Sequence, residues 1–103
     1  MGAYSPAPVV TDSVYERVMA EIIDPTVKGM MTDGNRYRGF LYAGLMIDKT
    51  GAPKVIEFNC RFGDPETQPI MMRLESDLAS HCLAACESRL LEETITWSSD
   101  ATI

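Results

Sequence analysis

The chain has 103 residues, of which 46% are hydrophobic and 23% charged, and its formal net charge at neutral pH is −6. This acidic balance argues against binding to nucleic acid or to an anionic membrane surface, because both of those partners are negatively charged. No apolar run is long enough to span a bilayer, and no basic region followed by an apolar stretch opens the chain. We therefore expect a globular domain with a modest core and a cytoplasmic location.

Two helices are predicted in the first third of the chain. Residues 12–23 fit a helix with Thr11 or Asp12 as its cap, because apolar residues recur there at four-residue spacing: Val14, Val18 and Ile22. Asp24 followed by Pro25 is typical of a new cap and a first helical turn. A second helix, to about residue 31, is therefore expected after a kink.

An antiparallel β-hairpin is predicted in the middle of the chain. Residues 38–48 are rich in aromatic and aliphatic side chains, residues 49–53 have the composition of a turn, and residues 54–60 form a second apolar run. Gly39 and Gly44 interrupt the first strand. Glycine in a strand indicates either the close approach of a ligand, such as a nucleotide, or a structural cause, which is a bulge or tight packing against a helix, and these interpretations stay open.

Ser76 and Asp77 predict the start of another helix, which should run to about residue 89. The fold class expected from these elements is α+β, an antiparallel sheet with helices packed on it. His81, the only histidine, is expected to be solvated or to cap a helix, because no serine or aspartate is placed to form a triad with it. All three cysteines are expected to be reduced: Cys60, Cys82 and Cys86. Cys82 and Cys86, four apart on the predicted helix, are also expected to be buried.

The end of the return strand carries the clearest candidate site. Side chains alternate between the two faces of a strand, so Glu57 and Asn59 should project from the same face, about 7 Å apart along the chain. A carboxylate and an amide carbonyl are hard oxygen ligands that suit Mg²⁺. Arg61 follows and is suited to neutralise a phosphate or a developing oxyanion. Taken alone, these residues also fit an exposed polar strand end without a ligand.

Residues 57–68, EFNCRFGDPETQ, resemble the metal-binding strand and following loop of the ATP-grasp ligases, and in detail those of the phosphoribosylamine–glycine ligase family. The resemblance continues upstream over residues 37–59. A second matching segment is MGAYSPAPVVTD, residues 1–12, which is similar to the substrate-side loop of that family.

This resemblance implies that residues 1–103 form the C-terminal half of an ATP-grasp domain. Residues from about 92 have the mixed polarity of a linker and would lead toward a following domain outside this chain. An isolated half-domain of this kind is expected to be inactive alone. It is also expected to form non-native dimers through apolar surface that the rest of its polypeptide would cover.

The activity implied by the resemblance is an ATP-dependent ligation. ATP would phosphorylate the carboxylate of glycine, the amine of phosphoribosylamine would attack the glycyl phosphate, and glycinamide ribonucleotide, ADP and phosphate would leave. A divalent metal, Mg²⁺ or Mn²⁺, would be held by Glu57 and Asn59, and Arg61 would act on the acyl phosphate. The remaining assignments are Gly63, Asp64 and Glu66 for the substrate and Met46 for the adenine of ATP. The implied partners are these small molecules and the remainder of the same polypeptide, without nucleic acid or membrane.

The metal site departs in one respect from the wider ATP-grasp pattern, in which the preceding strand often supplies a further carboxylate. Here that strand, GFLYAGLMI, carries no acid before Asp48, which adjoins the turn. Two protein ligands are therefore expected, with phosphate oxygens and water completing the shell. Two alternative functions stay open: another ATP-grasp carboxylate–amine ligase, and a non-catalytic α+β interaction domain that uses the polar loop as a binding edge.

Overall fold

The computed structural model describes residues 1–103 and divides into two compact units. One unit is Ala7–Arg61, and the other combines Met1–Pro6 with Phe62–Ile103. Four α-helices and one antiparallel pair of strands make up the regular structure, together with two short helical turns. The expected α+β class is therefore confirmed.

A continuous helical run crosses the Ala7–Arg61 unit. It consists of α1 Asp12–Val18, the π-helical turn η1 Met19–Ile23 and α2 Asp24–Thr32. Its start is fixed by Thr11, whose side-chain oxygen accepts a hydrogen bond from the Val14 N–H at 3.3 Å. The predicted cap at Thr11 and the first predicted helix are therefore confirmed.

The expected new cap at Asp24 is wrong. Asp24 has helical dihedral angles, φ −60° and ψ −44°, and the helix passes through it without a side-chain cap. Pro25 has no N–H to donate to the carbonyl four residues earlier, and the π-helical turn just before it accommodates the missing bond without ending the helix. The run ends where expected, at Asp33 and Gly34, where Gly34 adopts the left-handed φ of +80°.

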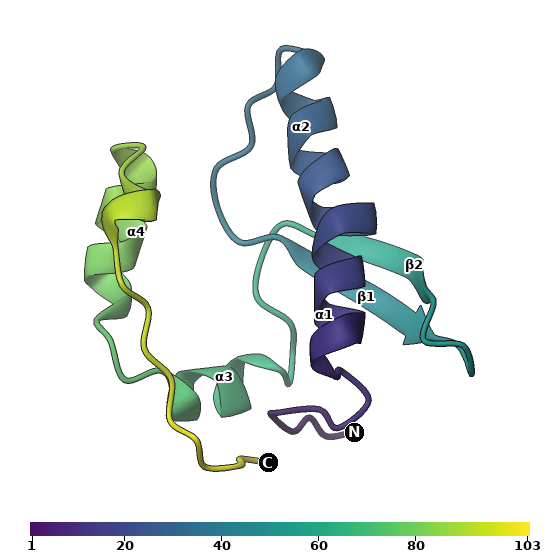
Figure 1. The fold of residues 1–103 in the computed structure, drawn as a ribbon. Helices are drawn as coiled ribbons and strands as arrows, with labels where there is room; N and C mark the ends of the chain where they lie inside the picture. Colours follow the sequence, from purple (N-terminus) through teal and green to yellow (C-terminus); the bar gives the residue numbers. More distant parts are fainter. The chain divides into compact units, whose positions relative to one another are not determined.

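The predicted antiparallel hairpin is confirmed as β1 Tyr42–Ile47 and β2 Pro53–Asn59. The expected start of the first strand near residue 38 is wrong, because Gly39 lies in a bend before β1 with a φ of +134° that a strand does not have. The helical run lies across this hairpin (Figure 1), and α1 contacts β2. Val14 and Ile22, both on the helical run, are buried and form the small apolar core of the unit. The helices thus cover the hairpin from one side.

The second unit is helical. It contains α3 Thr67–Arg73, α4 Leu78–Cys86 and the 3-10 turn η2 Leu90–Glu92. Asp77 caps α4 as predicted, by accepting a hydrogen bond from the Ala79 N–H at 2.9 Å. The helix ends at Cys86, before the expected boundary near residue 89.

The C-terminal segment is bonded to the rest of its unit, in contrast to the linker-like composition of residues 92–103. Trp97 forms a β-bridge with Leu74, and Thr102 forms one with Ser5. The Ser5 N–H donates to the Thr102 carbonyl at 2.9 Å, and the Thr102 N–H donates back to the Ser5 carbonyl at 2.8 Å. Ser5, near the start of the chain, and Thr102, near its end, therefore form a short antiparallel pair.

The cysteines are free thiols, as expected, but the expectation that Cys82 and Cys86 are buried is wrong. Cys60, Cys82 and Cys86 are all exposed. Two of them lie on α4, whose buried side chains are His81 and Ala84. The buried face of α4 is therefore made by these two residues, and the thiols take the solvent side.

Candidate functional site

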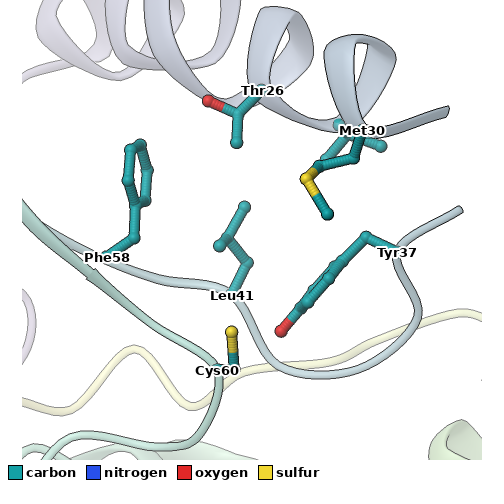
Figure 2. A pocket seen from close by; sticks show the side chains of 7 residues that line it. Thr26, Met30, Tyr37, Leu41, Phe58 and Cys60 are labelled. Atoms are coloured by element: carbon teal, nitrogen blue, oxygen red, sulfur yellow. The ribbon is translucent and has the colours of Figure 1, made fainter. Parts of the chain in front are cut away.

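The two faces of the β1–β2 hairpin have different surroundings. An apolar pocket of about 210 Å³ separates one face from α2. Figure 2 shows side chains of α2, of β2 and of the segments that flank the two strands around this pocket: Thr26, Met30, Tyr37, Leu41, Phe58 and Cys60. Because side chains alternate along β2, Glu57 and Asn59 belong to the opposite face, away from the helix. The polar ends of these two residues are therefore on the open face.

Tyr37 forms one wall of this pocket. Its hydroxyl donates a hydrogen bond to the Phe40 carbonyl. Burial against the pocket, followed by the contact with the Cys60 thiol, raises the pKa of Tyr37 above its ordinary value. The phenol is neutral near pH 7, so this pocket offers no charge to a metal ion or a phosphate group.

Glu57 and Asn59 lie together on the open face, as the alternation along the strand predicts. The side-chain amide of Asn59 donates a hydrogen bond to Glu57 Oε1 at 3.0 Å. The Glu57 side chain is exposed, and Asn59 is half-buried. The arrangement brings together, at the end of β2, a carboxylate and an amide, two groups whose oxygens are donor types that Mg²⁺ prefers.

Gly44 lies opposite Glu57 on β1. A Cβ atom at this position would be 3.0 Å from Glu57 Cγ, so the missing side chain gives the glutamate room. The strand register shifts between Gly44 and Leu45, where Ile56 is the extra residue of a β-bulge on β2. The bulge interpretation of Gly44 is confirmed, and the group that approaches this glycine closely is the Glu57 side chain.

Met46 lies two positions beyond Gly44 on β1 and is 60% exposed. The alternation along β1 puts it on the same face as Gly44, and Gly44 shares its face with Glu57 through their pairing. An apolar side chain therefore stands on the face that carries the oxygen pair. Its assignment to adenine stays a prediction.

The side chain of Asp48 is hydrogen-bonded within the hairpin turn. Its Oδ1 accepts hydrogen bonds from the Thr50 hydroxyl at 2.6 Å, the Thr50 N–H at 2.8 Å and the Ala52 N–H at 3.1 Å. These bonds, the one from the Thr50 hydroxyl above all, lower the pKa of Asp48. No group of three or more histidine, cysteine, aspartate or glutamate side chains in the chain is arranged to hold a metal ion. Glu57 is therefore not part of a cluster of three such side chains.

Arg61 follows the end of β2 in a bend, two positions beyond Asn59, and its side chain is exposed. It belongs to the same compact unit as Glu57, Asn59 and Met46. This unit therefore carries the Glu57–Asn59 pair, the Arg61 cation and the exposed Met46 side chain, all within the β1–β2 hairpin and the two residues that follow it.

Gly63, Asp64 and Glu66 belong to the other unit, in the turn that leads into α3. The Gly63 carbonyl accepts hydrogen bonds from the Thr67 hydroxyl at 2.6 Å and the Thr67 N–H at 3.1 Å. Gly63 is buried, Glu66 is half-buried and Asp64 is exposed. The Gly63 carbonyl is therefore fixed by its bonds to Thr67, while the Asp64 carboxylate is accessible to solvent.

Arg73, at the end of α3, was not singled out by the sequence. Its guanidinium donates to the Ser98 carbonyl through Nε at 3.2 Å and Nη2 at 2.9 Å, and to Ser5 Oγ through Nη1 at 2.8 Å. These partners lie 25 and 68 residues away along the chain. No local pattern signals such bonds, because they form only when distant segments meet.

His81 is buried and has a partner on each ring nitrogen, so the expectation of a solvated or capping histidine is wrong. The expectation that no serine is placed beside it is wrong as well. Nδ1 lies 3.0 Å from Glu93 Oε2, and Nε2 lies 2.7 Å from Ser76 Oγ. Ser76 Oγ also accepts a hydrogen bond from the Thr96 N–H at 3.1 Å. The histidine therefore links α4 to the segment before it and to the C-terminal segment.

No helix of the chain combines the length and the hydrophobicity that a membrane crossing would require.

Comparison with known proteins gives a consistent result. Residues 1–67 match the family model described as phosphoribosylglycinamide synthetase, ATP-grasp (A) domain. Relatives named phosphoribosylamine–glycine ligase are 71% identical in Escherichia coli strain K12, 69% in Salmonella typhimurium and 68% in Vibrio cholerae, each over all 103 residues of the chain. The chain spans 24% of the length of each of these relatives.

Proposed function

Because the chain belongs to the phosphoribosylglycinamide synthetase family, in its ATP-grasp (A) domain, we propose that it serves the ATP-dependent joining of glycine to phosphoribosylamine. In this reaction the γ-phosphoryl group of ATP passes to the glycine carboxylate and ADP leaves. The amine of phosphoribosylamine then attacks the glycyl carbonyl, an amide bond forms, and phosphate is released. The observation that carries the proposal is the Glu57–Asn59 oxygen pair on the open face of a hairpin that lies inside the matched region.

The donor chemistry of this pair fits a hard divalent cation, Mg²⁺ or Mn²⁺. The 3.0 Å separation between Asn59 Nδ2 and Glu57 Oε1 brings the two side chains close enough to serve one ion. When bound, the ion would neutralise phosphate charge during phosphoryl transfer. Two ligands from this chain leave positions for phosphate oxygens and water, so affinity for the metal should depend on nucleotide.

The other site residues fit the remaining needs of the reaction. Arg61 would stabilise the negative charge of the acyl phosphate through its cationic guanidinium, whose planar donors match phosphate oxygens. Met46 would provide an apolar contact for adenine. In the turn before α3, Gly63, Asp64 and Glu66 would bind the amine substrate, with the exposed Asp64 carboxylate as the accessible charge.

The exposed apolar side chains support a role inside a longer polypeptide. Met46, Ile56 and Phe58 of the hairpin are 60%, 65% and 43% exposed. Phe58 lines the pocket beside α2, whereas Met46 lies on the opposite face, so apolar side chains are exposed on both faces of the hairpin, as is typical where another part of a protein covers them. We therefore propose that the domain works with the remainder of a ligase of the relatives' length, on small-molecule substrates in the cytoplasm.

A chimaeric ligase tests the proposal. The Escherichia coli relative is rebuilt so that this 103-residue sequence replaces its matching segment, and glycinamide ribonucleotide is measured with glycine, phosphoribosylamine, ATP and Mg²⁺. The proposal predicts product that requires all four components. No product from a folded chimaera would contradict it, and product from another carboxylate in place of glycine would favour a different ATP-grasp ligase.

A further inference from the structure

We propose that Arg73 is a positioning residue for the amine substrate. It would hold the MGAYSP segment, residues 1–6, against α3, which follows directly on the turn of residues 63–66. The proposal rests on the function proposed above, in which residues 63–66 bind the amine, and on the similarity of residues 1–12 to the substrate-side loop of the family. Both segments belong to the same compact unit.

The first observation is the bonding of the Arg73 side chain. Its three donor nitrogens serve two separate segments: Nη1 bonds Ser5 Oγ at 2.8 Å, while Nε and Nη2 bond the Ser98 carbonyl at 3.2 and 2.9 Å. The Ser98 N–H returns a bond to the Arg73 carbonyl at 2.7 Å. A planar guanidinium with donors in a fixed fork is suited to this task, whereas a lysine offers one flexible ammonium.

The second observation is the bonding at the two ends of α3. At its first residue, the hydroxyl and N–H of Thr67 bond the Gly63 carbonyl at 2.6 and 3.1 Å. At its last residue, Arg73 bonds Ser5 of the MGAYSP segment. The helix is seven residues long, about 10 Å at 1.5 Å per residue. It therefore acts as a short rigid spacer between the two segments.

The C-terminal segment adds further bonds between the MGAYSP segment and α3. Thr102 pairs with Ser5 through two backbone bonds, and its hydroxyl donates to the Pro69 carbonyl inside α3 at 3.0 Å. The MGAYSP segment is thus bonded to α3 directly by Arg73 and indirectly through Thr102. Of the side chains in these bonds, only the Arg73 guanidinium reaches both the N-terminal and the C-terminal segment.

The experiment measures steady-state kinetics of the chimaeric ligase with Arg73→Met, Arg73→Lys, Ser5→Ala and the double variant Arg73→Met/Ser5→Ala. Arg89→Met is the matched control, since Arg89 lies in the same unit and its guanidinium bonds only the exposed Glu87 and Glu92. Positioning predicts that the KM for phosphoribosylamine rises roughly tenfold or more in Arg73→Met. The KM for ATP should stay within about twofold, because Met46 and Glu57 belong to the other unit.

The further variants separate positioning from general stability. Arg73→Lys should recover part of the lost affinity for the amine. Ser5→Ala should raise the KM for phosphoribosylamine less than Arg73→Met does, because Arg73 also bonds Ser98. The double variant should resemble Arg73→Met, because the bond between Arg73 and Ser5 is already lost when Arg73 is replaced. Equal rises in the KM of the amine and of ATP, or an unchanged KM with a lower amount of folded enzyme, would overturn the proposal. An active, unmodified chimaera with an unchanged Arg73→Met KM would overturn it while leaving the proposed function intact. An inactive folded chimaera would overturn both.

Discussion

The side-chain amide of Asn59 donates a hydrogen bond to Glu57 Oε1 at 3.0 Å. One Glu57 oxygen is therefore engaged by its neighbour, and the amide oxygen of Asn59 is left for another partner. Gly44 gives this pair its room, because it lies opposite Glu57 without a side chain. The geometry of the candidate metal site thus depends on a glycine on the neighbouring strand as well as on the two ligands.

Gly44→Ala should lower activity without unfolding the domain. The added Cβ would lie 3.0 Å from Glu57 Cγ, so the glutamate must move by a few tenths of an ångström. We expect kcat of the chimaeric ligase to fall roughly tenfold, because small misplacements of catalytic groups are costly. Gly29→Ala in α2 is the control, since a Cβ there meets nothing within 4 Å. Equal kcat in the two variants would show that Gly44 does not set the position of Glu57.

The cap of α4 should make stability depend on pH in the acid range. Hydrogen bonds from the Ser80 hydroxyl and the Ala79 N–H lower the pKa of Asp77 below its ordinary value of 3.8. A lowered pKa in the folded state gives stability that is present above pH 3.8 and is lost as pH falls through the folded-state pKa.

Asp77→Asn removes this charge but keeps a capping side chain. The urea midpoint of the parent chain should exceed that of Asp77→Asn near pH 6, and the difference should vanish below the folded-state pKa. A difference that stays constant down to that range would contradict a role for the carboxylate charge.

The His81 network should stabilise the second unit. Glu93→Ala removes the partner of His81 Nδ1 and leaves a polar atom of a buried side chain unsatisfied. We expect the free energy of unfolding to fall by about 1–3 kcal/mol, measured by urea unfolding monitored through the Trp97 fluorescence. Glu92→Ala is the matched control, because the Glu92 side chain is 68% exposed and its loss should cost less than about 0.5 kcal/mol. Equal losses in the two variants would argue against the network.

Features with local causes could be predicted from the sequence. Thr11 and Asp77 cap their helices through bonds to N–H groups only two or three residues away. Glu57 and Asn59 share a face because of strand alternation, which is also local. The candidate metal pair was therefore accessible from the sequence.

Features that depend on distant segments or on irregular helical geometry could not be predicted. Asp24 and Pro25 have the pattern of a new helix start, yet the π-helical turn before them lets the helix continue. The bonds of Arg73 and His81 join residues far apart in the chain, so no spacing indicates them. α3 is short and carries Pro69 near its start, and short helices give little periodicity to read.

The most direct test of the account is the Glu57→Gln variant of the chimaeric ligase, assayed across a Mg²⁺ titration at fixed ATP. The substitution removes the carboxylate charge and keeps nearly the same shape. Loss of a metal ligand should lower kcat by roughly 10²-fold or more and raise the Mg²⁺ concentration needed for half-maximal rate. Glu75→Gln, at an exposed glutamate outside the candidate site, should leave both unchanged. Glu57→Gln with parental kcat and Mg²⁺ dependence would contradict the assignment of the metal site to this pair.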